Sequence, residues 1–266
     1  MSLRLASFNL FSGRSLLDGL VDPARVVEAV QELDADLLAL QEVDRYQDRS
    51  GGQDQAALVA EALGAQAHRF VPLVAGTPGV PGWSHAPRTA PHHPPPDGPS
   101  YGVALISRRP VLAWHVLHLD PPAGRWPIPI PSRPPRLMWL ADEPRAAVAA
   151  VLEQPRMTVA CTHLSFVPGV NARQLRRVRR WLAGLPGPHV LLGDLNLPGR
   201  LPARLTGWTP LVSAATFPAP APRVQFDHVL AAGLGPEVSA TGRAVQLPIS
   251  DHRAVLADLE LGAGQA

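Results

Sequence analysis

The chain has 266 residues, of which 46% are hydrophobic, and a formal net charge of +2. A chain of this length can bury a full core, and α/β folds of this size are commonly one domain, so we expect a single domain over residues 1–266. Every basic residue apart from histidine is arginine. Because the net charge is nearly balanced, the sequence pI of 9.3 is not an argument for nucleic-acid binding.

The single cysteine, Cys161, excludes an intramolecular disulfide and a cluster of thiolate metal ligands. We expect it to be a small core residue inside a strand. No apolar stretch approaches the roughly 20 residues of a membrane-spanning helix, and a first strand from position 3 leaves no room for a signal peptide. The expected location is the cytoplasm and the expected state is a monomer.

Strands and helices alternate in the first part of the chain. A short apolar run predicts a strand at Leu3–Phe8, and another predicts a strand at 36–40. Between them, Asp22 followed by Pro23 has the N-cap and first-turn chemistry of a helix. The buried face of that helix is predicted to hold Val26, Val27, Val30 and Leu33.

A second helix is expected at about 54–63, where Gly64 would end it. After it, residues 72–99 and 121–135 are so rich in proline that neither a regular helix nor a central strand is expected. Both segments are therefore predicted to be long surface loops that shape access to a site. In the second loop, three arginines could meet an anionic substrate: Arg125, Arg133 and Arg136.

The second half of the chain again interleaves strands with a helix. Apolar runs predict strands at Met157–Cys161, Val190–Leu192 and Phe226–Leu230. A helix should start at Asn171 and bury Leu175, Val178 and Leu182. The final strand, at 254–259, does not separate polar from apolar residues, which predicts burial on both of its faces.

Polar residues of ligand and catalytic types follow or end these strands: Asn9, Glu42, His163, Asp194, Asn196, Asp227 and the triplet Ser250-Asp251-His252. One edge of a sheet would carry them all. A metal-assisted active site is built in this way on β-strands.

Seven short motifs in this order resemble those of the endonuclease/exonuclease/phosphatase superfamily, the deoxyribonuclease-I-like phosphoesterases. They are Ser7-Phe8-Asn9, Gln41-Glu42-Val43, Tyr101-Gly102 with the strand to Arg108, Thr162-His163-Leu164, Gly193-Asp194-Leu195-Asn196, Phe226-Asp227-His228 and Ser250-Asp251-His252. Each motif is common alone, but their order over residues 7–252 is not. The resemblance implies an α/β fold, a four-layer α/β sandwich of two packed mixed sheets flanked by helices, with a divalent cation, usually Mg²⁺, at its end.

The chemistry of phosphoester cleavage asks for a hard cation with oxygen ligands. Glu42 is the expected principal ligand of Mg²⁺, with Mn²⁺ as a substitute, and the family pattern brings Asn9 and Asp251 close enough to assist. A lone glutamate after a strand is more often a solvated surface carboxylate, so the metal interpretation depends on the accompanying motifs.

Asp194 resembles the residue that orients or deprotonates the attacking water, and Asn196 can donate a hydrogen bond to the phosphate. A local Asx-type turn is the simpler alternative for this pair. His163 and His252 are candidates to donate to phosphoryl oxygens or to act as general acid or base. Asp227 resembles the carboxylate that orients an active-site histidine, and the sequence leaves open which one.

Two further residues are weaker candidates for substrate binding. Arg145 resembles a strand-start arginine of the family, although a surface salt bridge explains it equally well. Tyr101 with Gly102 resembles the phosphate-side turn, and a packing tyrosine is the alternative. The outward arginines of the third helix are predicted to be a solvated face rather than a nucleic-acid site: Arg173, Arg176, Arg177, Arg179 and Arg180. Three loop histidines are expected to be surface residues rather than a second metal site: His85, His92 and His93.

The resemblance implies a Mg²⁺-dependent hydrolase of a phosphodiester or phosphomonoester but does not choose the substrate. Few loop aromatics, no lysine and a near-balanced charge favour a small or lipid-like phosphoester over long duplex DNA. A DNA endonuclease or exonuclease for repair or degradation is the alternative enzyme. A noncatalytic scaffold that binds a partner through the proline-rich loops is the alternative from another class.

Overall fold

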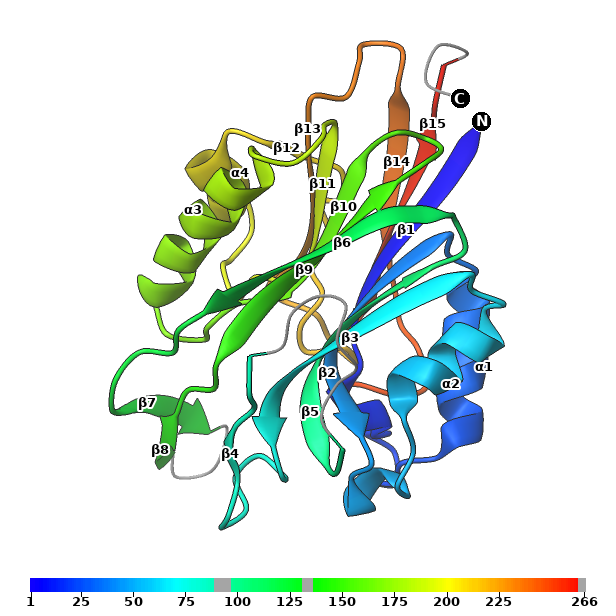
Figure 1. Cartoon of the computed structure of the whole chain (residues 1–266). Coiled ribbons are helices and arrows are strands. Elements are labelled where there is room, and N and C mark those ends of the chain that lie inside the picture. Colours follow the sequence, from blue (N-terminus) through cyan, green and yellow to red (C-terminus); the bar gives the residue numbers. More distant parts are fainter. Residues whose placement is uncertain (89–96, 131–135, 263–266) are drawn as a thin grey trace.

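The computed structural model describes residues 1–88, 97–130 and 136–262, in which two large mixed sheets lie face to face (Figure 1). The strands of the first sheet are β1 (Ser2–Asn9), β2 (Leu37–Arg45), β3 (Ala67–Ala75), β4 (Ser84–His85), β5 (Ser100–Ser107), β14 (Ser239–Val245) and β15 (Ala254–Glu260). Their order across the sheet is β14-β15-β1-β2-β5-β3-β4, with β1 parallel to β2.

The second sheet contains β6 (Val111–Leu119), β9 (Arg145–Leu152), β10 (Thr158–His163), β11 (His189–Asp194), β12 (Thr209–Pro210) and β13 (Asp227–Ala232). Their order is β12-β13-β11-β10-β9-β6, with β10 parallel to β11. A separate two-stranded ribbon pairs β7 (Arg125–Ile130) with β8 (Arg136–Ala141).

Helices cover the outer face of each sheet. The first sheet packs against α1 (Pro23–Leu33) and α2 (Gln55–Ala62), and the second packs against α3 (Val170–Leu182) and α4 (Leu201–Thr206) (Figure 1). Short 3₁₀ turns lie at Phe11–Gly13 and Asp48–Ser50. The predicted four-layer α/β sandwich is therefore confirmed. No helix in the described part of the chain is long and apolar enough to cross a membrane.

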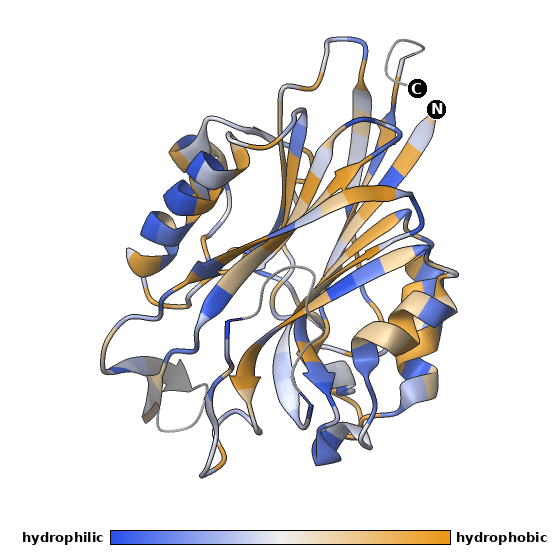
Figure 2. Cartoon of the chain, viewed as in Figure 1, coloured by the Kyte–Doolittle hydropathy of each residue, from blue (hydrophilic) through white to orange (hydrophobic). Residues whose placement is uncertain are grey.

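Strands of the inner layers bury both faces, because a strand places successive side chains on opposite sides. In β2, Leu37 and Ala39 pack into the core between the sheets, whereas Leu38 and Leu40 pack toward the helices. The strand β15 divides its residues in the same way, which confirms the predicted two-sided burial of the last strand. Figure 2 shows the hydrophobic residues concentrated along these facing strands.

The helix ends follow the predicted signals. The Asp22 carboxylate accepts a hydrogen bond from the Ala24 amide at 2.9 Å and caps α1. On the buried face of α1, Val27 is only half-buried, and Ala29 is fully buried instead. The predicted stripe of α3 is buried as expected, and all five of its arginines are exposed, which confirms the solvated helix face.

The sequence underestimated the length of the strands toward one end of the sandwich. The first strand runs on to Asn9, and the second continues past Glu42 to Arg45. Likewise, β10 and β11 end on His163 and Asp194 rather than before them. Asn9, Glu42, His163 and Asp194 are therefore members of the strands.

The prediction of two long proline-rich loops was partly wrong. Pro72 lies inside β3, at a point where the pairing with β5 shifts register, and a bulge accommodates the missing amide hydrogen. In the second segment, Pro127 and Pro129 belong to β7, which has β8 as its only partner strand. Alternate residues of such a strand direct their backbone amide away from the partner, so proline is tolerated at those positions. Residues 89–96 and 131–135, including His92, His93 and Arg133, lie outside the described residues.

Candidate active site

A cavity of about 640 Å³ opens at the end of the sandwich where the polar strand ends meet. Seven predicted site residues contribute to its wall: Glu42, Tyr101, Arg145, His163, Asp194, Asn196 and His252. The other three, Asn9, Asp227 and Asp251, lie beside these residues rather than in the wall that the described residues form.

The register of the second sheet brings three of these residues together. His163 pairs with Asp194 across the parallel strands β10 and β11, and Asp194 pairs with Asp227 across β11 and β13. Gly193 precedes Asp194 with a φ of 154°, and a Cβ there would lie 1.9 Å from the Thr162 carbonyl oxygen. Only glycine allows the two strands to approach so closely at this point.

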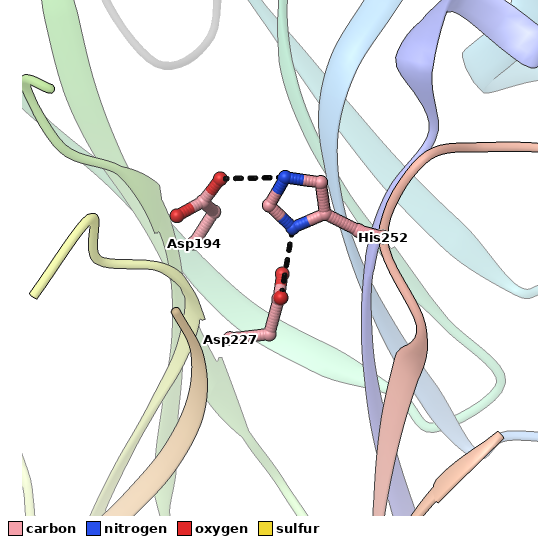
Figure 3. A group of neighbouring side chains, drawn as sticks. All are labelled: Asp194, Asp227 and His252. Carbon is pink, nitrogen blue, oxygen red and sulfur yellow. Dashed lines mark hydrogen bonds and ion pairs between the residues drawn. The ribbon is translucent and has the colours of Figure 1, made fainter. Parts of the chain in front are cut away.

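His252 lies between two carboxylates (Figure 3). Its Nδ1 is 2.8 Å from Asp227 Oδ2, and its Nε2 is 3.8 Å from Asp194 Oδ2. The backbone amide of His252 donates to the hydroxyl of Ser250, whose hydroxyl in turn donates to the Asn9 carbonyl at 2.6 Å. This contact anchors the turn before β15 to the end of β1. The question left open by the sequence is thus answered, because Asp227 holds His252.

The electrostatics of this group favour a charged imidazole. Burial alone would lower the pKa of His252, but the Asp227 and Asp194 carboxylates outweigh it and raise that pKa to about 10. Burial, together with the Asp227 charge, raises the pKa of Asp194 to about 7, although His252 opposes the shift. His252 is therefore protonated at neutral pH, while Asp194 can exchange a proton there.

The two oxygens of Asp194 have different partners. Oδ1 accepts from the Asn196 backbone amide at 2.9 Å, so the Asx-type turn is present. Oδ2 accepts from the Asn9 side-chain amide at 3.2 Å and faces His163 Nε2 at 3.6 Å. The turn thus holds one oxygen and leaves the other among the polar groups of the site.

His163 is neutral in this site. Burial, Arg145 and His252 together hold its pKa well below the ordinary value. The Asn196 side-chain nitrogen lies 3.3 Å from His163 Nε2 and also donates to the Leu164 carbonyl at 3.0 Å. Asn196 itself has a φ of 49°, which turns the chain sharply after β11 and directs its side chain back toward His163.

Glu42 occupies a bulge of β2, between the regular pairs on either side, with a φ of 55°. Bulges re-aim side chains next to active sites, and here Glu42 reaches the cavity wall. Its Oε1 accepts from the Asn9 side-chain amide at 3.1 Å. Burial raises the pKa of Glu42, the Asn9 hydrogen bond lowers it, and the Asp251 charge raises it further. Glu42 is half-buried, and its poorly compensated negative charge, with oxygen donors nearby, suits a hard divalent cation.

A different set of possible metal ligands is also close together, since Asp194, Asp227 and His252 each offer an atom within 4.8 Å of the others. His252 is a poor ligand there, because Nδ1 is hydrogen-bonded to Asp227 and the ring is protonated. We therefore interpret this group as a hydrogen-bonded cluster.

Arg145 and Tyr101 are both buried in the cavity wall. The guanidinium of Arg145 donates to Asp142 Oδ1 at 2.7 Å, and the Asp142 side chain is buried. This excludes the alternative that Arg145 forms a surface salt bridge. Its Nε is buried without a hydrogen-bond partner among the described residues. Burial raises the pKa of the Tyr101 hydroxyl well above its ordinary value, and the Glu42 charge adds to this.

The sequence analysis missed three charged residues of the wall: Arg14, Arg49 and Glu143. Burial raises the pKa of Glu143 to about 7 against the attraction of Arg145, and the Glu42 charge raises it further. Arg49 bonds both oxygens of Asp44 and lies over the Tyr101 ring, 5.5 Å from its centroid. A pair of carboxylates just before β9, which is apolar after Arg145, was a usable signal for Glu143, whereas nothing local marks Arg49.

The proline-rich segments also reach the cavity. Trp83, Pro78 and Gly79 from the first segment and Arg125 from the second contribute to its wall. This arrangement agrees with the predicted role of these segments in access. His85 is exposed on β4, as expected of a surface histidine.

Comparison with known proteins gives a consistent result. The Endonuclease/Exonuclease/phosphatase family model matches residues 6–252. None of the curated proteins matched the chain. Among solved structures, an endonuclease/exonuclease/phosphatase from Beutenbergia cavernae is 21% identical, with a TM-score of 0.64 over 98% of this chain and 72% of the other.

Two more solved structures share the fold. A family protein from Bacteroides thetaiotaomicron is 15% identical, with a TM-score of 0.62 over 99% of this chain and 96% of its own. Truncated TDP2 from Caenorhabditis elegans is 17% identical, with a TM-score of 0.58 over 97% of each chain. At these identities the likeness supports the fold and leaves the substrate open.

Proposed function

Because this chain belongs to the endonuclease/exonuclease/phosphatase family, whose members are metal-dependent hydrolases of phosphoesters, we propose that it is a Mg²⁺-dependent hydrolase of a phosphodiester or phosphomonoester. One observation carries the proposal: the side chains of Glu42, His163, Asp194 and His252 line a single cavity. These residue types can supply a cation ligand, a base and hydrogen-bond donors around one space in which a phosphoryl group could lie.

In this proposal, Glu42 is the principal ligand of Mg²⁺, Asn9 and Asp251 assist, and Mn²⁺ substitutes. When bound, the cation supplies positive charge to the phosphoryl oxygens and to the leaving group. The hydrogen bond between Asn9 and Glu42 supports the pairing of these two residues in one site.

The protein groups would handle the protons. Asp194 would accept the proton of the attacking water, and a pKa of about 7 suits a general base at neutral pH. Asp227 would hold His252 by Nδ1, so that the protonated Nε2 is free to donate to a phosphoryl or leaving-group oxygen. His163 and Asn196 would donate hydrogen bonds to the phosphate, and Arg145 and Tyr101 would bind the substrate.

The cavity favours a small or lipid-like phosphoester. Its volume lies within the range of about 300–1,000 Å³ that is typical of small-molecule sites. Four arginines in its wall suit an anionic substrate: Arg14, Arg49, Arg125 and Arg145.

A nuclease is the second candidate, and one observation favours it. The wall contains four aromatic side chains on which unpaired bases could stack: Phe11, Trp83, Tyr101 and Phe166. A noncatalytic scaffold is less well supported, because the ligand-type residues and both histidines are present together. Monomeric state and cytoplasmic location stay predictions from the sequence.

The test is a metal titration of hydrolysis with bis-(p-nitrophenyl) phosphate, plasmid DNA and an oligonucleotide with an abasic site. Hydrolysis should require Mg²⁺ or Mn²⁺. Glu42→Gln should raise the metal concentration for half-maximal rate by about 10-fold or more, since even partners of metal ligands contribute that much.

Glu61→Gln is the matched control, because Glu61 is exposed on α2 and should leave the titration unchanged. Full activity of Glu42→Gln at low Mg²⁺ would refute the metal assignment. Hydrolysis of none of the three substrates with either metal would favour the scaffold.

A further inference from the structure

Apart from Arg125 at its base, the ribbon of β7 and β8 has no part in the catalytic proposal. Its strands pair with one another and with no other described strand. It links the site end of β6 to Asp142 and Glu143, just before β9, and Figure 1 shows it apart from the two sheets. At its base, Arg125 pairs with Ala141, and both residues line the cavity. The rest of the ribbon leads away from the site.

Apolar side chains are exposed on both faces of this ribbon. Trp126 pairs with Leu140, whereas Trp139 pairs with Pro127. Paired residues share a face and successive residues alternate, so Trp126 and Trp139 lie on opposite faces. Trp126 is 38% exposed, Trp139 is 57% exposed and Leu137, on the face of Trp139, is 63% exposed. Neither face is therefore covered at these positions by the described part of the protein.

This composition is unfavourable in water. An isolated two-stranded ribbon is only marginally stable there, and exposed clusters of large apolar side chains usually mark a binding surface. A protein partner would cover one face and leave the other exposed. A lipid–water interface, in contrast, can surround both faces at once.

Three further features fit a lipid surface. Tryptophan prefers the boundary between headgroups and acyl chains. The two strands contain two arginines, Arg125 and Arg136, and no acidic residue, which suits an anionic surface. Pro127 and Pro129 remove amide donors from β7 and so disfavour addition of another strand at that edge.

We propose that the β7–β8 ribbon inserts into a lipid–water interface and thereby holds the mouth of the cavity at the membrane surface. The residues at its base belong to the cavity wall, so insertion would place the cavity within reach of phosphoesters in the interface. The proposal concerns binding and does not depend on turnover.

The experiment is co-sedimentation of the full chain with vesicles of phosphatidylcholine that contain phosphatidylglycerol as the minor component, without added metal. The unaltered protein should bind. Leu137→Ser/Trp139→Ser should weaken binding by about 10- to 100-fold, as expected from the loss of two large apolar contacts. Trp126→Ser, on the opposite face, should also weaken it by about 10-fold.

Leu112→Ser is the matched control. Leu112 is 57% exposed in β6, near the end remote from the cavity, and its replacement should leave vesicle binding unchanged. Hydrolysis of soluble bis-(p-nitrophenyl) phosphate by Leu137→Ser/Trp139→Ser should equal that of the unaltered protein, if the proposed activity is present. Loss of vesicle binding and loss of hydrolysis are thus measured separately.

Three outcomes would overturn the proposal. The first is no vesicle binding by the unaltered protein. The second is equal weakening by Leu112→Ser, which would indicate nonspecific adsorption. The third is that substitutions on only one face of the ribbon weaken vesicle binding, which would assign the ribbon to a one-sided contact with a protein. Sedimentation velocity would then show whether that protein is a second copy of this chain.

Discussion

At the scale of single residues, the charge of His252 is set by two carboxylates acting against burial. A buried imidazole without a carboxylate partner of this kind loses its proton, as His163 does in the same cavity wall. His252 keeps its proton because Asp227 accepts a hydrogen bond from Nδ1 and Asp194 faces Nε2. The two histidines of this cavity therefore differ in charge. The protonated His252 is suited to donate to an anion, and His163 is suited to act as a neutral partner.

Replacing Asp227 with asparagine should remove that protonation. In the metal-free protein, Asp227→Asn should lower the pKa of His252 from about 10 toward or below its ordinary 6.5. Because the folded-state pKa lies above the ordinary value, protonation stabilises the fold fully below pH 6.5, and this contribution disappears as the pH rises through about 10. The variant should lose that pH-dependent stability, and its turnover should fall by roughly 10²–10⁴-fold.

Histidine NMR titrations would measure these pKa values. The exposed His68 is an internal reference, whose titration should be the same in the unaltered protein and in Asp227→Asn. A His252 pKa that stayed near 10 in Asp227→Asn would show that Asp227 does not set the charge.

At the scale of elements, the site depends on how closely β10 and β11 approach. The two strands are parallel neighbours, and Thr162 pairs with Gly193 one position before the pair His163 and Asp194. The absence of a side chain at Gly193 lets the Thr162 carbonyl come within 1.9 Å of the place a Cβ would take. The spacing of His163 and Asp194 is therefore fixed by a glycine that has no chemical role itself.

Gly193→Ala should be far more damaging than an ordinary glycine substitution. Its Cβ would collide with backbone, so we expect a loss of more than about 4 kcal/mol of unfolding free energy, in the range reserved for severe substitutions. Gly207→Ala is the control, because Gly207 also has a positive φ, 73°, but has open space around it, and should cost about 1–2 kcal/mol. Urea unfolding would measure both, and similar losses for the two variants would disprove the close-approach argument.

At the scale of the whole molecule, the arginines of α3 and those of the cavity wall have different surroundings. Those of α3 are exposed on its outer face, above a buried stripe of Leu175, Val178 and Leu182. In the cavity wall, Arg49 and Arg145 are held by the buried carboxylates of Asp44 and Asp142. The net charge of +2 therefore does not show that some arginines are held in place at the site while others are exposed to solvent.

This distribution predicts a shallow salt dependence of substrate binding. A protein that neutralises about six or more DNA phosphates loses roughly 10³-fold or more in affinity between about 50 and 200 mM salt, and a small phosphoester releases far fewer counterions. Replacing Arg176, Arg177 and Arg180 together by Gln should leave kcat/KM on the best substrate within about 2-fold. Measuring KM against salt for the unaltered and triple-substituted enzymes would check both. A steep salt dependence, or a loss confined to polymeric DNA, would favour the nuclease.

Much of the fold follows from local patterns in the sequence. Asp22-Pro23 caps a helix because a carboxylate and a fixed φ act on neighbouring amides, whatever lies elsewhere in the chain. The alternating burial of Leu37–Leu40 follows from the two-residue period of a strand with a layer on each side. The ordered motifs predicted the family correctly, because residue types and their order are read directly along the chain. These features are local or sequential, and the sequence alone determined them.

Only the tertiary structure decided which of these residues touch. Asn9 donates to Asp194 over 185 positions of the chain, and His252 bonds to Asp227 although His163 was an equal candidate. Burial of the Arg145–Asp142 pair, the place of Arg49 in the wall and the exposure of both faces of β7–β8 were equally invisible in the sequence. Each depends on the packing of distant elements, because burial, charge and hydrogen bonding act through space, whereas sequence patterns report only neighbours along the chain.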